Sequence, residues 1–155
     1  MLYSEMGFNV VAFAYRGYSD STLDGGFPSE KVLKQDAKAI VTYVREELKK
    51  DGASLFLIGR SLGGAVATFA ATIEPDLFDG IILENTFTSI SDMVDSLFYL
   101  VSFFKYFILR IDWDTKALVS TIKLPMLIIT GDKDEIVPAM HSKYIFDAAK
   151  MSYFR

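Results

Sequence analysis

The 155-residue chain contains no cysteine, which excludes disulfide bonds, thiolate metal sites, a cysteine nucleophile and palmitoylation of the chain itself. The absence of cysteine is compatible with an intracellular, reducing compartment, but the sequence does not fix one. The basic residues are scattered and the formal net charge is −4, so no nucleic-acid partner is expected. The residues that follow Met1 show no basic stretch leading into an apolar one, so no signal peptide is expected.

A long uninterrupted hydrophobic run is also lacking. The most apolar stretch, residues 94–111, is interrupted by Asp95, Lys105 and Arg110. Its longest uncharged run, residues 96–104, falls well short of the ~20 residues that a membrane-spanning helix needs. We interpret the stretch as a buried or interfacial helical region, and an interfacial helix would place residues 94–111 in contact with a membrane surface. A membrane-spanning helix is the alternative.

What is present is enough apolar sequence, 51% of the residues, for the core of one domain. Strands are predicted at 9–15, 54–58, 80–83 and 125–130, and helices before Gly7 and at 28–50, 65–72, 91–111 and 138–151. The run at 9–15 has almost no polar alternation, which is typical of a strand buried on both faces. The alternation predicts an α/β fold: a parallel sheet with helices on both faces and ligands at the carboxyl ends of its strands.

The segment GRSLG at 59–63 joins a predicted strand directly to a predicted helix. This is the context of a nucleophile elbow, in which the serine, here Ser61, occupies a strained turn. Gly59 and Gly63 carry no side chain to collide, and the Leu62 N–H is a candidate oxyanion donor. The alternative is an ordinary glycine turn in which Ser61 caps the helix.

Acidic residues follow two of the predicted strands. Asp134 is the favoured catalytic acid, because a carboxylate at the end of a strand can fix the tautomer of a histidine and stabilise its charged form. Asp132 in the same turn and Glu84 at the end of the third predicted strand are the alternatives. Capping of a turn is the non-catalytic interpretation of all three. No metal cluster or phosphate-binding loop is visible, and no cofactor is expected.

Four segments together resemble a known family: VVAFAYRGYSDS at 10–21, LIGRSLGGAVA at 57–67, LENTFTSISDM at 83–93 and GDKDEIVP at 131–138. They resemble the Bem46-like (ABHD13-like) branch of the α/β-hydrolase superfamily and, more distantly, the ABHD17-type protein depalmitoylases. The resemblance implies a Ser–His–acid hydrolase that acts on an ester, thioester or amide carbonyl.

Matched residue by residue, the resemblance places Ser61 as the nucleophile, Leu62 as the oxyanion donor and Asp134 as the acid. It also implies that Arg16-Gly17-Tyr18 lines the mouth of the site. The family usually has a glycine at the next position, where this chain has Ser19.

The resemblance further implies a histidine beyond the last predicted helix and one more strand, and a second oxyanion N–H in a loop before the first helix. Neither falls within residues 1–155, so we expect a single partial domain that lacks the N-terminal strands and the last strand of the full fold. The one histidine, His141, follows Asp134 too closely to serve as the base and is expected at the surface or the pocket rim. Either the chain is part of a longer esterase or thioesterase and is inactive alone, or it is an inactive subunit that binds a protein partner.

A helical, lid-like insertion is expected at about 90–115, over a small acyl ester or an acylated protein as substrate. An ordinary packed helix pair is the alternative, and a peptidase or a haloperoxidase-type activity on the same scaffold stays open. The aromatic and aliphatic residues of the insertion are Phe98, Tyr99, Leu100, Phe103, Phe104, Tyr106 and Phe107.

Overall fold

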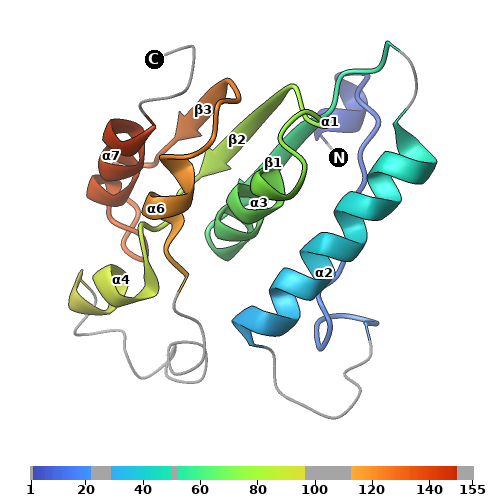
Figure 1. The fold of residues 1–155 in the computed structure, drawn as a ribbon. Helices are drawn as coiled ribbons and strands as arrows, with labels where there is room; N and C mark the ends of the chain where they lie inside the picture. The colour runs from blue at the N-terminus through green and yellow to red at the C-terminus, as the bar shows by residue number, and fades with distance from the viewer. Residues whose placement is uncertain (1, 22–28, 50–51, 97–112, 150–155) are drawn as a thin grey trace.

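A three-stranded parallel sheet forms the centre of the computed structural model, which describes residues 2–21, 29–49, 52–96 and 113–149 (Figure 1). The strands are β1 (Phe56–Arg60), β2 (Gly80–Glu84) and β3 (Met126–Ile129), in the order β1-β2-β3. Ile58 pairs with Ile82, and Ile82 pairs with Leu127, so the carboxyl ends of the strands lie side by side. Three of the four predicted strands are therefore confirmed.

Helices and turns connect these strands, and most of them begin at the residues that the sequence indicates. The Ser29 hydroxyl caps the longest helix by accepting a hydrogen bond from the Val32 N–H, and Pro138 precedes the last helix. The helix predicted to run to residue 50 instead passes into a π-helical turn at Val44, and the short helix α6 was not predicted. The helical elements are α1 (Leu2–Glu5), α2 (Glu30–Tyr43), η1 (Val44–Leu48), α3 (Leu62–Ile73), α4 (Ile90–Ser96), α6 (Thr115–Val119) and α7 (Ala139–Ala148).

The two faces of the sheet are covered unequally. Leu57, Ile81, Leu83 and Met126 point to one face, where they pack in clusters with residues of α3, α6 and α7. Most of the side chains directed to the opposite face, among them Ile58, are exposed to solvent, and the expected second layer of helices is not seen in the part of the chain that the structure describes. The exposed hydrophobic residues of this face are Phe56, Ile58, Leu127 and Ile129.

The prediction of a strand at residues 9–15 is wrong. The segment carries no strand assignment, and among the described residues its backbone forms no ladder with β1. Val10, Val11 and Phe13 are exposed, and a cavity of about 160 Å³ lies between Phe13, β1, α2 and α3. An apolar, β-branched run forms a strand only beside another strand, and none of the described residues supplies one at this edge.

No helix among the described residues is long and apolar enough to cross a membrane. Most of the predicted lid, residues 97–112, lies outside the described residues, including Phe98, Phe103 and Phe104. Its first part is seen as α4, and its last residues, 113–115, lead into α6.

Candidate active site

Ser61 occupies a sharp turn between β1 and α3. Its backbone has φ 51° and ψ −121°, outside the regions that L-residues ordinarily adopt. Its N–H donates to the carbonyl oxygen of Glu84 at 3.0 Å, which fixes the turn to the end of β2. The Ser61 side chain makes no capping hydrogen bond to α3, so the alternative of a helix-capping serine has no support in the geometry. The hydroxyl is therefore held on a strained backbone and does not cap the helix that follows it.

Two glycines make this turn possible. A Cβ at Gly59 would lie 2.2 Å from the Gly63 carbonyl oxygen, and a Cβ at Gly64 would lie 1.8 Å from the Thr86 hydroxyl oxygen. A side chain at Gly63 was also expected to collide, but a Cβ there would meet only the Tyr15 hydroxyl oxygen, at 3.7 Å. The close approaches thus occur at the residue two before the serine and at the residue three after it.

The N-terminus of α3 begins directly after Ser61. The first N–H groups of a helix have no partner within the helix, and the helix dipole adds a partial positive charge there. The Leu62 N–H is the first of these groups, and Leu62 itself packs beside the core cluster that contains Ala65 and Val66. The buried body of α3 therefore holds its N-terminus in place at the carboxyl edge of the sheet.

Asp134 lies in the turn after β3, at the same edge. Its Oδ1 accepts the backbone N–H of Ile136 at 2.8 Å and that of Val137 at 2.9 Å. Its Oδ2 accepts a hydrogen bond of 2.6 Å from the side-chain amide of Asn85, the residue after β2. Asp134 is thus a partly buried carboxylate held by three N–H donors.

The other two candidate acids have different surroundings. Asp132 is exposed to solvent. Glu84 is half-buried, and its Oε1 lies 3.8 Å from Nε of Arg60, an ion pair on the surface of the sheet edge. The carboxyl ends of β1, β2 and β3 lie side by side, so Glu84 and Asp134 are at the same edge of the sheet as Ser61.

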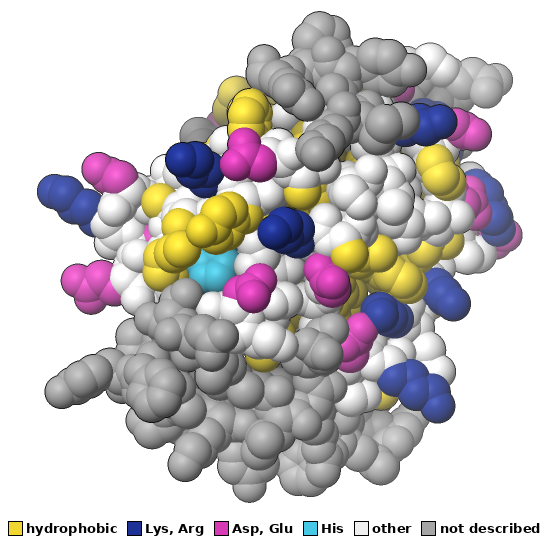
Figure 2. All heavy atoms as spheres, turned by 60° about the vertical axis from the view of Figure 1, so that its left-hand side comes forward, with side chains coloured by type: hydrophobic (Ala, Val, Ile, Leu, Met, Phe, Trp, Pro, Cys, Tyr) yellow, Lys and Arg dark blue, Asp and Glu magenta, His cyan; other side chains and the backbone are white. Residues whose placement is uncertain are grey.

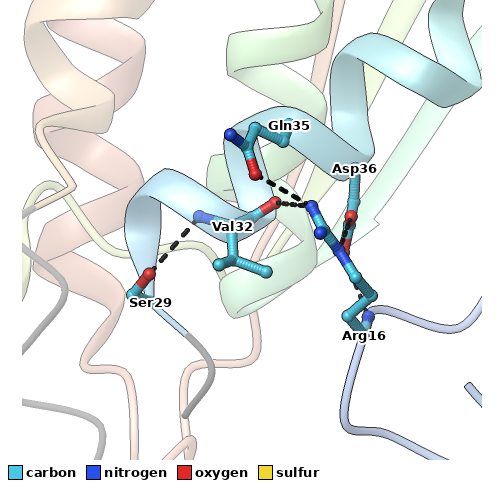
Figure 3. Close-up of polar contacts among 5 residues, drawn as sticks. All are labelled: Arg16, Ser29, Val32, Gln35 and Asp36. Atoms are coloured by element: carbon cyan, nitrogen blue, oxygen red, sulfur yellow. Dashed lines mark hydrogen bonds and ion pairs between the residues drawn. The ribbon is translucent and has the colours of Figure 1, made fainter. Parts of the chain in front are cut away.

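The loop at residues 16–19 is tied to α2 (Figure 3). Nε of Arg16 donates to Oδ1 of Asp36 at 2.6 Å, its backbone N–H donates to Oδ2 at 3.0 Å, and Nη2 donates to the Gln35 side chain at 3.0 Å. Gly17 and Ser19 have φ of 84° and 50°, so this loop reverses twice through the left-handed region. The guanidinium therefore points to α2, and Arg16 contributes to the shape of the loop.

Tyr15, just before this loop, was missed in the sequence although it approaches the serine turn. Its hydroxyl is the group nearest to a hypothetical Cβ at Gly63. Burial, with smaller effects of Tyr18 and Asp36, raises the pKa of Tyr15 to about 12. The phenol is thus a neutral hydroxyl group, and the YRG pattern gave no sign that it would pack beside α3.

His141 is only 2% exposed, so the expectation of a surface or rim position is wrong. Its Nδ1 lies 2.9 Å from the Thr88 hydroxyl, which donates to Asp92 at 2.6 Å, while Nε2 has no partner. Burial lowers the pKa of His141, and nearby Asp92 partly opposes this shift. Figure 2 shows hydrophobic side chains gathered around the histidine. Met140 and Tyr144, which lie on α7 with His141, are exposed.

In the described part of the chain, no group of three or more His, Asp or Glu side chains could hold a metal ion. The candidate site thus consists of Ser61 with the α3 N-terminus, Asn85, and Asp134. These residues follow three neighbouring strands, and the arrangement brings a serine hydroxyl, the N-terminus of a helix and a hydrogen-bonded carboxylate to one edge of the sheet. A histidine base beside them is not among the described residues.

Comparison with known proteins gives the family. Residues 3–112 match the family described as serine aminopeptidase, S33, and the chain belongs to this family of α/β-hydrolases. The chain is similar to the uncharacterized membrane protein YNL320W of Saccharomyces cerevisiae, with 37% identity over 154 residues, 98% of this chain and 53% of the relative. It is also similar to the protein bem46 of Schizosaccharomyces pombe, with 38% identity over 148 residues, 94% of this chain and 48% of the relative.

The resemblance to the Bem46-like branch is therefore confirmed, and the chain spans about half the length of the curated relatives it matches. Among solved structures, an esterase of Pyrococcus furiosus is similar with a TM-score of 0.75 and 20% identity, over 97% of this chain and 59% of that one. This likeness shows the α/β-hydrolase fold, as the sequence predicted.

Proposed function

We propose that the chain supplies the nucleophile and the acid of a serine hydrolase that cleaves esters or thioesters through an acyl-enzyme on Ser61. The observation that carries the proposal is the backbone of Ser61, whose positive φ is retained although its side chain caps nothing. Strain of this kind costs on the order of 1–3 kcal/mol and persists where it serves a function. In this proposal the turn is a nucleophile elbow.

The proposed reaction follows from the geometry. Ser61 Oγ attacks the substrate carbonyl carbon, and its proton passes to a histidine base. The Leu62 N–H and the positive end of α3 stabilise the oxyanion. Asp134 orients the histidine and stabilises its charged form, the leaving group departs with the proton, and water then releases the acyl group.

We infer that the base and the second oxyanion donor belong to parts of a longer protein outside these 155 residues. His141 is a poor candidate, because it is buried against Thr88 and α7 would have to unwind to free it. Two features support this inference: the relatives are about twice as long, and one face of the sheet together with the 9–15 segment exposes apolar side chains. This chain alone is then inactive or nearly so.

The substrate proposed is a small acyl ester or an acylated protein, with the acyl chain, or a membrane surface, against residues 94–111. Substituting both Phe103 and Phe104 with serine tests this idea. Hydrolysis of long-chain esters should fall further than that of short-chain esters, and an equal loss for both would contradict it.

The alternative is a binding or assembly subunit without activity. It is favoured by the absence of an available histidine among the described residues and by the exposed sheet face. A protein partner would then cover that face.

Labelling with a fluorophosphonate probe separates the two functions. The 155-residue chain should label weakly or not at all, whereas a form extended at both ends to the length of the relatives should label at Ser61. Ser61→Ala should abolish the label without loss of folding, as judged by circular dichroism. Failure of the extended form to label would favour the binding subunit.

A further inference from the structure

Asn85 is aimed across the end of β3 by its backbone. Its φ of 45° lies in the left-handed region, which asparagine tolerates better than most residues do. Its N–H donates to the Ile129 carbonyl oxygen at 2.9 Å, so the last ladder contact between β2 and β3 places the side chain over the turn that follows β3. The strained backbone and the ladder together fix this direction.

The side-chain amide joins both ends of that turn. Its Oδ1 accepts the Gly131 N–H at 2.9 Å, and its Nδ2 donates to Oδ2 of Asp134 at 2.6 Å. A backbone N–H can only donate and a carboxylate can only accept, so these partners determine which way the amide faces. An isosteric carboxylate or an aliphatic group at this position could not make both bonds.

The carboxylate of Asp134 then has little acceptor capacity left. A carboxylate offers about four lone-pair sites. Oδ1 uses two of them for the N–H groups of Ile136 and Val137, and Oδ2 uses one for Asn85. The remaining site is on Oδ2, beside the Asn85 amide.

We propose that Asn85 is a positioning residue for the hydrolytic reaction: it holds the Asp134 carboxylate so that the free lone pair of Oδ2 receives the N–H of the histidine base. The inference rests on the function proposed above. Asn85 acts through Asp134 and does not touch the substrate. It also couples β2 to the acid, so the nucleophile turn, which bonds to Glu84 at the end of the same strand, and the acid share one anchor.

The hydrogen bond between Asn85 and Asp134 can be tested in this 155-residue chain without an assay of catalytic activity. The sequence has two asparagines, Asn9 and Asn85, and one glutamine, Gln35, so a ¹H–¹⁵N spectrum contains only three side-chain amides. One amide proton of Asn85 should exchange slowly with solvent and lie downfield of those of Asn9. Asp134→Ala should remove both signatures, whereas Asp132→Ala should leave them. If the wild-type Asn85 amide exchanges as fast as that of Asn9, the proposal is overturned, and this measurement requires no variant.

The catalytic consequence is tested by the rate of fluorophosphonate labelling in the form extended at both ends. Asn85→Gly accepts the positive φ but loses both side-chain bonds, and it should slow labelling about tenfold, the size expected for a lost hydrogen bond to a charged group. Asn9→Ser is the matched control and should label at the wild-type rate. An Asn85→Gly variant that labels as fast as wild type overturns the positioning role.

Asn85→Asp provides a readout that a merely structural role would not move. An added negative charge beside Asp134 favours the charged form of the histidine, so the acidic limb of the pH–rate profile should shift to higher pH. An unshifted limb contradicts the proposal. If the wild-type extended form does not label at all, the proposed function fails, and the amide exchange alone still decides whether Asn85 holds Asp134.

Discussion

The two faces of the sheet carry similar apolar side chains, but one face is buried and the other is largely exposed to solvent. On the covered face Leu83 is 1% exposed, whereas Leu127, on the neighbouring strand and the opposite face, is 54% exposed. Apart from Arg60 and Glu84 at their carboxyl ends, the three strands are apolar on both faces, as in a sheet that is covered on both sides. The difference indicates that the described helices cover one face of the sheet, while none of the described residues covers the apolar side chains of the other face.

The largest expected effect comes from truncating a leucine on each face. Leu83→Ala removes a fully packed side chain and should lower the free energy of unfolding by about 3 kcal/mol. Leu127→Ala, the matched variant, should lower it by less than about 1 kcal/mol, since the side chain is already half in water. Urea denaturation of both variants checks the difference. Equal losses would mean that the exposed face is buried in solution.

The next largest effect on stability should come from a methyl group added at Gly59, in the turn that holds Ser61. Gly59→Ala places a Cβ against the Gly63 carbonyl oxygen, a backbone atom that cannot move away, and should cost about 2–3 kcal/mol. Gly63→Ala meets no close atom and gains helix propensity, so it should be neutral or slightly stabilising. Thermal unfolding would contradict this ordering if the two variants were equally stable.

Backbone strain at Ser61 should appear as a difference in stability between a glycine and an alanine at this position. Ser61→Gly accepts φ 51° without strain and should be about 1 kcal/mol more stable than Ser61→Ala, which keeps the strained backbone. Both lose the hydroxyl, so the comparison isolates the backbone. If the two variants unfold at the same denaturant concentration, the turn carries no strain.

The smallest expected effect is a pH dependence from His141. Its pKa is lowered in the folded chain, so between the ordinary value of 6.5 and the folded value the unfolded chain binds more protons. Stability should therefore fall as pH decreases below about 6.5 and level off below the folded pKa. Asp92 on α4 is a charged group that acts on His141 and partly opposes the lowering of its pKa, and Lys116 on α6 acts in turn on Asp92.

In the variant His141→Gln, the midpoint of urea denaturation should depend less on pH over that range than it does in the wild type. Because His141 is the single histidine, its ring protons can be followed by NMR without assignment of any other. A titration midpoint above 6.5 would contradict burial as the dominant cause.

The sequence predicted those features that depend on local chemistry. The apolar runs at 54–58, 80–83 and 125–130 became β1, β2 and β3, and Ser29 and Pro138 mark helix starts as their side chains dictate. The run at 9–15 is similarly apolar but forms no strand among the described residues, because pairing requires a neighbouring strand that the sequence pattern alone does not supply.

The sequence predicted the parts of the candidate site that depend on local pattern, but not the contact that depends on how the strands pair. Ser61 and Asp134 stand at strand ends, which a pattern of alternating elements can locate. The contact between Asn85 and Asp134 joins residues 49 positions apart, and only the strand register brings them together. The available signal was a single asparagine directly after a strand, a residue that tolerates left-handed backbone. His141 was misplaced because its burial depends on how α7 packs against the loop before α4.

The most direct test of Ser61 as a nucleophile is trapping of its acyl-enzyme. The form extended at both ends is mixed with excess p-nitrophenyl acetate, quenched in acid, and examined by mass spectrometry of its peptides. One acetyl group on the peptide that contains Ser61, absent in Ser61→Ala, is the predicted result. Acetyl groups only on lysines, at the same level in both proteins, would contradict it.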